Sequence, residues 1–142
     1  MEREDALKMW DDIFGDRKWA LDCFGTWIYR DDYGDTEKKR NNRPGSDGKY
    51  YSYGWEIDHI RPKNDFEKNS NPDLNNNYEP MHWENNRAKT DQYPCFNIGD
   101  VQYRVVLCDI CSRHGLLGYG ITNPAGIRID WKGSTNRYYV KN

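Results

Sequence analysis

The sequence is poor in aliphatic residues. Leu, Ile, Val and Phe account for only 23 of its 142 residues, a proportion at which disorder becomes a serious alternative. Two other features argue against disorder, because the formal net charge is only −2 and the chain contains 11 Tyr and 6 Trp. We therefore expect one compact, polar domain with an aromatic-rich core, in keeping with the usual size of a domain.

The sequence also lacks long apolar runs. No stretch approaches the roughly 18 apolar residues of a membrane-spanning helix. The opening segment, MEREDALKMW, is acidic and does not have the basic and apolar regions of a signal peptide. We expect a soluble protein of the cytoplasm.

Charge is distributed unevenly along the chain. Acidic residues outnumber basic ones before residue 36, whereas basic residues are slightly in excess after it. The densest basic run consists of Lys38, Lys39, Arg40 and Arg43. Such a run is usually a solvated loop, and the alternative is a loop that contacts phosphate groups.

Periodicity predicts a mixture of helices and strands. Apolar residues at helical spacing from Leu7 to Phe14, continued weakly through Trp19, Cys23 and Trp27, predict one or two short helices before Gly34. Residues 34–49 read as a loop, and residues 61–77 as a long polar one. The expected later elements are a strand at 50–57, a strand at 78–81, a helix at 83–90, and further strands at 101–108, 126–131 and 137–141.

The residues with chemical potential lie in two short segments. Asp58 and His59 stand at the end of an expected strand, and an amide-rich helix start follows the long loop. Hydrolysis of a phosphodiester needs a base for the water and a cation for the charge that develops on the phosphate. Mg²⁺ takes oxygen ligands and retains several waters, so one Asp and one Asn oxygen suit it.

An ordered set of residues in these segments resembles the HNH family of nucleases, which belong to the ββα-metal endonucleases. The resemblance spans residues 55–91 and implies an α+β fold. It implies a ββα-metal (HNH) finger at 50–93, and the elements expected from periodicity place an N-terminal helical and loop segment at 1–49 and a β-rich C-terminal extension at 94–142. The residues that carry it are Asp58, His59, Pro62, Asn77, Pro80, Asn86 and Lys89.

The resemblance also implies a role for individual residues. His59 matches the general base that activates water, and Asp58 and Asn86 match ligands of Mg²⁺, for which Mn²⁺ can substitute. Asn77 matches the Asn that fixes the loop and thereby orients the base. The expected contacts to the DNA backbone are Arg61, Lys63, Arg87 and Lys89.

Two assignments stay open at this point. Asn85 competes with Asn86, because the match depends on the register of the helix. His82 either reaches the site or packs at the start of the helix, and the second role is the more common one.

The resemblance implies a metal-dependent endonuclease that nicks or cleaves DNA, which we expect to be double-stranded, in the cytoplasm of a bacterial or phage-infected cell. The alternative is a non-catalytic nucleic-acid-binding or assembly module that uses the finger as a scaffold. The presence of the complete polar set favours the enzyme.

The four cysteines admit two interpretations. Cys108, Cys111 and His114 form a Cys-x-x-Cys-x-x-His cluster that, together with Cys95, has the ligands of a tetrahedral zinc site. The spacing matches no standard zinc finger, so thiols without metal are the more common state for such residues.

Overall fold

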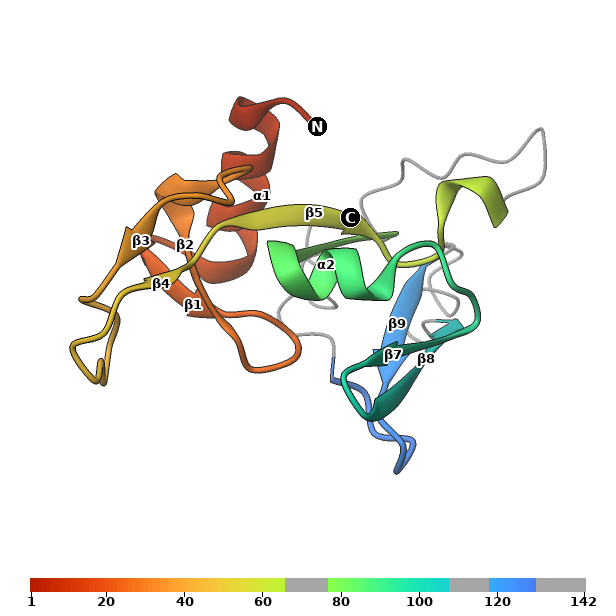
Figure 1. Cartoon of the computed structure of the whole chain (residues 1–142). Coiled ribbons are helices and arrows are strands. Elements are labelled where there is room, and N and C mark those ends of the chain that lie inside the picture. The colour runs from red at the N-terminus through yellow and green to blue at the C-terminus, as the bar shows by residue number, and fades with distance from the viewer. Residues whose placement is uncertain (66–76, 108–117, 130–142) are drawn as a thin grey trace.

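A computed structural model of the chain describes residues 1–65, 77–107 and 118–129. Within them the protein is an α+β fold built from small antiparallel sheets, which confirms the expected fold class (Figure 1). No helix of this part of the chain is long and apolar enough to cross a lipid bilayer. The elements are α1 (Arg3–Phe14), β1 (Trp19–Leu21), β2 (Trp27–Tyr29), η1 (Arg30–Asp32), β3 (Lys39–Arg40), β4 (Tyr51–Ser52), β5 (Trp55–His59), η2 (Lys63–Asp65), β6 (Tyr78–His82), α2 (Trp83–Lys89), β7 (Cys95–Ile98), β8 (Val101–Leu107) and β9 (Tyr119–Thr122).

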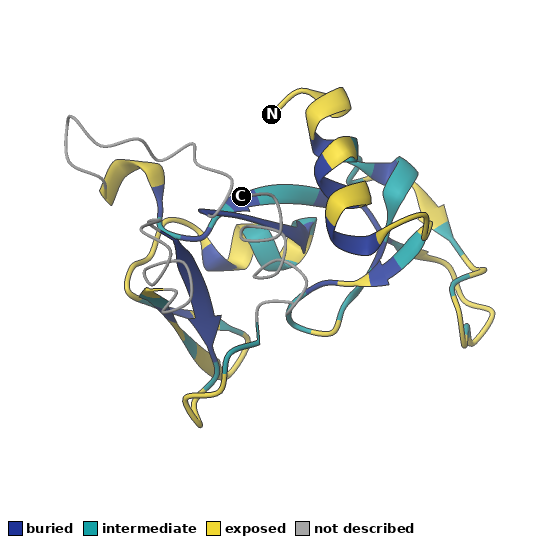
Figure 2. Cartoon of the chain, turned by 180° about the vertical axis from the view of Figure 1, so that it is seen from behind, coloured by how far each residue is buried: buried dark blue, intermediate teal, exposed yellow. Residues whose placement is uncertain are grey.

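The helix expected from residue 7 onward is confirmed as α1. Its buried residues follow the helical repeat, and the exposed ones cover the opposite side (Figure 2). Trp10 is fully buried, and its ring centroid lies 5.1 Å from that of Trp55 on β5. The helix ends where Gly15 takes a positive φ of 71°. Aromatic packing of α1 on β5 thus forms the first of two core clusters.

The helical continuation expected through residue 27 is wrong, because this segment forms the antiparallel hairpin β1–β2. The turn between the strands is organised by Asp22. Its Oδ1 accepts hydrogen bonds from the backbone N–H groups of Phe24 (3.0 Å) and Thr26 (2.9 Å). This turn explains the failure, since an Asp side chain that bonds to the backbone ahead of it competes with helix formation.

The strand expected over residues 50–57 is two strands, β4 and β5, separated at Gly54. A Cβ atom at Gly54 would overlap the carbonyl oxygen of Asp35, so only glycine fits this close approach of two backbones. Residues 34–49 were expected to be loop throughout, but β3 within them pairs with β4.

The strands β5 and β6 and the helix α2 form one continuous unit. The strands pair antiparallel, with Trp55 opposite His82 and His59 opposite Tyr78. The helix begins at the residue after β6 and lies alongside β5 (Figure 1). The expected strand at 78–81 and the helix at 83–90 are therefore confirmed, within one residue at their ends.

The C-terminal part contributes a three-stranded antiparallel sheet in the order β7-β8-β9. The strand expected at 101–108 corresponds to β8. Of the strand expected at 126–131 the structure describes residues 126–129, among which Arg128 forms an isolated bridge with Thr122. The expected strand at 137–141 lies outside the described residues. This sheet buries Phe96, Val105, Tyr119 and Ile121 against Ile60 and Met81, which forms the second core cluster.

Candidate active site

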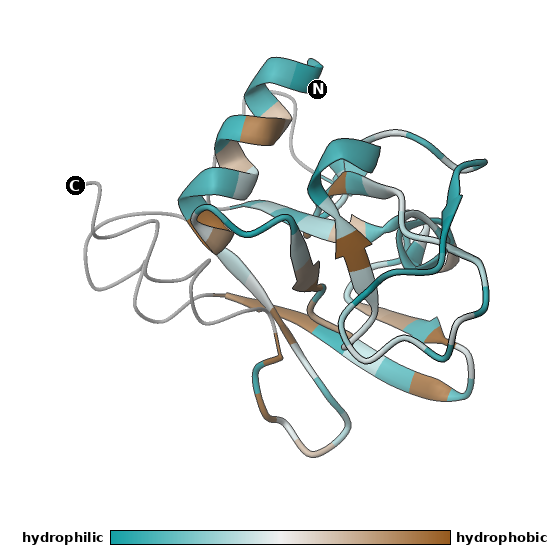
Figure 3. Cartoon of the chain, turned by 90° about the vertical axis from the view of Figure 1, so that its left-hand side faces the viewer, coloured by the Kyte–Doolittle hydropathy of each residue, from teal (hydrophilic) through white to brown (hydrophobic). Residues whose placement is uncertain are grey.

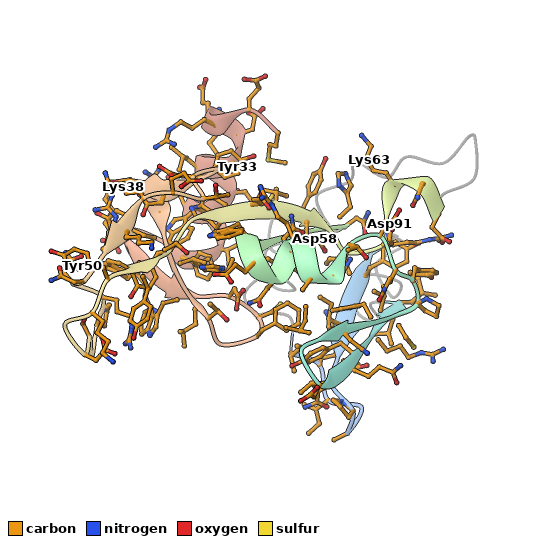
Figure 4. All side chains as sticks on the ribbon, in the orientation of Figure 1. Tyr33, Lys38, Tyr50, Asp58, Lys63 and Asp91 are labelled. Atoms are coloured by element: carbon orange, nitrogen blue, oxygen red, sulfur yellow. The ribbon has the colours of Figure 1, made fainter. Side chains whose placement is uncertain are left out.

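Asp58 lies in the interface between β5 and α2, and only 6% of its surface is exposed (Figure 4). The Lys89 ammonium lies 3.1 Å from its Oδ2 and donates a hydrogen bond to its Oδ1 at 3.4 Å. Burial raises the pKa of Asp58 to about 7, although the Lys89 charge acts in the opposite direction. Among the described residues, Oδ2 accepts no hydrogen bond.

Lys89 is completely buried, which corrects its expected role as a phosphate contact. Besides Asp58, its ammonium donates to the carbonyl oxygen of His59 at 3.3 Å and lies 5.2 Å from the centre of the Phe96 ring. Lysine is among the residues least often buried, and here the carboxylate of Asp58 compensates for its lost hydration.

His59 is the last residue of β5 and is half-buried. Its ring packs edge-on against Tyr78, with 5.0 Å between the ring centroids. Tyr78 belongs to the core cluster around α1, whereas Asp58 contacts α2. Because neighbouring residues of a strand point to opposite faces, the side chains of Asp58 and His59 leave the β5–β6 pair on different sides.

The structure distinguishes Asn85 from Asn86. The Nδ2 group of Asn85 donates to Asp22 Oδ2 and to Thr26 Oγ1, both at 2.9 Å, so this side chain anchors the β1–β2 turn. The Nδ2 group of Asn86 donates to Glu56 Oε1 at 3.1 Å and therefore faces β5. Of the two, Asn86 is the one that lies in the same interface as Asp58.

Asn77 braces the chain just after His59. It is 1% exposed; its Oδ1 accepts from the backbone N–H of Arg61 at 2.8 Å, and its Nδ2 donates to the Arg61 carbonyl at 3.0 Å. Its own carbonyl accepts from the N–H of Ile60 at 2.8 Å. The side chain of Asn77 thus fixes Arg61, and its main-chain carbonyl fixes Ile60.

Replacing Asn77 by Ala is expected to lower the free energy of unfolding by about 2 to 4 kcal/mol, because both backbone groups of Arg61 lose their partner. Asn77→Asp keeps only the hydrogen-bond acceptor, so its free energy of unfolding should lie between those of the unsubstituted chain and Asn77→Ala. Urea titration measures these changes, and Asn97→Ala, at an exposed position of β7, is the matched control. Equal stabilities of the Asn77→Ala and Asn97→Ala chains would show that the hydrogen bonds between Asn77 and Arg61 do not stabilise the fold.

His82 is a structural residue of the described fold. Its Nδ1 accepts a hydrogen bond from the backbone N–H of Glu84, and its Nε2 lies 2.9 Å from the carbonyl oxygen of Ser52. Since a carbonyl oxygen can only accept, Nε2 carries the proton and the ring is satisfied on both sides. His82 therefore caps α2 and ties it to β4 instead of reaching the site.

The residues expected to contact DNA differ in how far they are exposed to solvent. Arg61 donates to Asp65 Oδ2 at 2.9 Å and to the Tyr119 hydroxyl at 2.8 Å, so it links η2 to β9, and its expected role as a phosphate contact stays a prediction. Arg87 is 58% exposed and lies 3.2 Å from Glu56 Oε2, and Lys63 is exposed. Arg87 and Lys63 are thus the two of the four that face solvent.

The basic run of the sequence lies on the β3–β4 hairpin, which is coloured hydrophilic in Figure 3. Arg40 is engaged in two bonds of 2.8 Å to Asp32 and stacks on the Tyr29 ring. Lys38 and Lys39 are exposed. Figure 4 shows Lys38 at the left-hand side of the molecule and Asp58 near its centre, so the run does not border the candidate site.

The candidate cation ligands are one carboxylate and one amide. Within the described ranges, no three side chains of His, Cys, Asp and Glu gather into a metal-binding group. Asp58 and Asn86 offer oxygen atoms of the kind that Mg²⁺ prefers, while both oxygens of Asp58 face the Lys89 ammonium, at 3.1 and 3.4 Å. For the zinc interpretation, Cys95 lies half-buried on β7 near Arg104, while Cys108, Cys111 and His114 lie outside the described residues.

Glu56 and Asp22 were missed by reasoning from the sequence. Glu56 stands two residues before Asp58, and the period of two in a strand places both on one face. That period was the available signal for Glu56. No local pattern indicates that Asp22 receives hydrogen bonds from the distant residues His82 and Asn85.

No family model, curated protein or solved structure matches this chain. The family resemblance therefore rests on the ordered residues of the sequence alone.

Proposed function

We propose that the chain is a metal-dependent endonuclease of the HNH type, which hydrolyses phosphodiester bonds of DNA. The observation that carries the proposal is the β5–β6–α2 unit: two antiparallel strands run directly into a helix that holds Asn86 and Asp58 in one interface. The brace from Asn77 to the residues that follow His59 agrees with the role that the resemblance implies for it.

In the proposed reaction, a ring nitrogen of His59 takes a proton from the attacking water. General-base catalysis of this kind contributes about 10² to 10⁴ in rate. Asp58 and Asn86 would hold Mg²⁺, which when bound supplies charge stabilisation for the phosphate and the leaving oxygen. Arg87 and Lys63, both exposed, would contact the phosphates that flank the scissile bond.

The position of His59 at the end of β5 is essential to this mechanism. Asp58 and His59 face different sides of the strand pair, so the substrate must lie across the strand end to meet both. The Lys89 ammonium on Asp58 opposes a second positive charge at this carboxylate, so it would have to turn away when Asp58 holds the ion.

A non-catalytic nucleic-acid-binding module is the second candidate. The observation that favours it is the pairing of Asp58 with a buried lysine, because this neutralises the carboxylate without any metal ion. The two candidates differ in a single assay on plasmid DNA.

The purified chain is expected to nick supercoiled plasmid in the presence of Mg²⁺ or Mn²⁺. EDTA should reduce the rate to that of buffer alone, and excess Mg²⁺ should restore it, because the proposed reaction needs a cation at the phosphate. Gel electrophoresis of the plasmid measures the conversion. Cleavage that persists unchanged in EDTA would contradict the proposed mechanism, and DNA binding without any cleavage would support the second candidate.

A further inference from the structure

Glu56 holds two residues of α2 from its place on β5. Its Oε1 accepts a hydrogen bond from Asn86 Nδ2 at 3.1 Å, and its Oε2 lies 3.2 Å from the Arg87 guanidinium. The side chain is 24% exposed and points to the same face of β5 as Asp58. Both of its oxygens are therefore engaged by the helix.

This contact fixes the orientation of the Asn86 amide. An ionised carboxylate accepts hydrogen bonds and donates none, so the NH₂ group of Asn86 must face Glu56. The amide oxygen is then turned away from Glu56. Only this oxygen can bind a cation, since the NH₂ group is a donor without ligand capacity.

Helix geometry places this contact beside the Asp58 pair. Asn86 and Lys89 are three residues apart and share one side of α2, and Glu56 and Asp58 are two residues apart on one side of β5. The contacts Asn86–Glu56 and Lys89–Asp58 therefore lie next to each other, about 7 Å apart along the strand. A fixed Asn86 amide thus borders the carboxylate that would share the cation.

We infer that Glu56 is a positioning residue of the cation site, which acts by presenting the Asn86 oxygen to the metal. This inference rests on the proposed function and adds a residue to which the resemblance gave no role. Both oxygens of Glu56 are turned to Asn86 and Arg87 on α2, and a direct role of Glu56 as a ligand would be seen as loss of Mn²⁺ binding in Glu56→Gln.

Mn²⁺ titration of the full chain by calorimetry tests the inference without any measurement of activity. Glu56→Ala should weaken Mn²⁺ binding by about 10- to 100-fold, the usual effect of losing a partner that orients a metal ligand. Glu56→Gln retains an oxygen that accepts from Asn86 and should bind Mn²⁺ as the unsubstituted chain does. In plasmid nicking, Glu56→Ala should need more Mg²⁺ for half-maximal rate, while the rate at saturating Mg²⁺ changes less.

Asp11→Ala is the matched control, since Asp11 forms a comparable carboxylate–guanidinium pair with Arg30 on the surface of α1. It should leave Mn²⁺ binding unchanged. Thermal unfolding in EDTA shows whether each variant folds as the unsubstituted chain does.

The possible outcomes separate this inference from the proposed function. Mn²⁺ binding that is equal in Glu56→Ala and the unsubstituted chain overturns the role of Glu56 alone. Equal weakening in Glu56→Ala and Glu56→Gln also overturns it, because the charge and not the hydrogen bond would then matter. If the unsubstituted chain neither binds Mn²⁺ nor cleaves DNA, the proposed function is overturned together with this inference.

Discussion

A chain carrying His59→Ala is expected to bind DNA with the affinity of the unsubstituted chain and to nick it about 10² to 10⁴ times more slowly. The reason is that the imidazole is the only proposed proton acceptor, whereas binding depends on charged side chains elsewhere. Affinity is measured by titration of labelled duplex in Ca²⁺ or EDTA, and the nicking rate by plasmid conversion in Mg²⁺.

His82→Asn provides the comparison for this loss. An Asn side chain can still accept from the N–H of Glu84 and cap α2, but it loses the bond to Ser52. This variant should lose stability and retain the nicking rate per folded molecule. Full activity of the His59→Ala chain would remove His59 from the mechanism, whatever the metal dependence.

Lys89→Met is expected to destabilise the fold at pH 8 by about 3 to 5 kcal/mol, because it leaves the buried carboxylate of Asp58 without its counter-charge. At pH 5 the loss should be much smaller. The pKa of Asp58 is already raised to about 7 in the presence of Lys89, so at pH 5 the carboxyl is neutral and has no charge to compensate.

The sign of the pH dependence follows from proton binding. Between its ordinary pKa of 3.8 and about 7, Asp58 binds more protons in the folded than in the unfolded chain. The contribution of this group to stability therefore falls as the pH rises through that range. Removal of Lys89 raises the pKa of Asp58 in the folded chain further. The contribution of Asp58 to stability therefore continues to fall at higher pH.

Urea titrations at pH 5 and pH 8 measure this difference. The double variant Asp58→Asn/Lys89→Met, which removes both charges, should recover most of the stability lost at pH 8. If Lys89→Met loses the same free energy at both pH values, the carboxylate of Asp58 is not the cause.

The sequence was sufficient to predict the strand β6 and the helix α2, because each carries its own local signal, whereas the single strand expected at 50–57 is divided into β4 and β5. Aromatic residues mark the strands, and the end of α2 before Pro94 is typical of a helix stop. The hairpin β1–β2 was mistaken for helix because its apolar residues also fit a helical repeat. What decides between the two is Asp22, whose side chain joins the turn to a helix some 60 residues later.

The candidate site was predictable in its residue types and not in its contacts. The resemblance singled out Asp58, Asn77 and Asn86, but nothing local shows that Lys89 is buried, since that depends on Asp58 and on Phe96 from the C-terminal sheet. Arg61 likewise looked free to meet phosphate because its partner Tyr119 follows 58 residues later. Long-range partners of charged residues are the part that a single sequence does not reveal.

The second core cluster sets a limit on how far the chain can be shortened. Ile60 and Met81 come from the strand pair, and they share this core with Phe96, Val105, Tyr119 and Ile121 of the later sheet. A fragment that ended at residue 93 would lose the packing partners of these two apolar side chains and the Phe96 ring beside Lys89. It would therefore expose all three side chains to water. The strands after residue 93 therefore cover one side of the candidate site. The smallest part of this protein that can fold and carry the site must extend at least through β9.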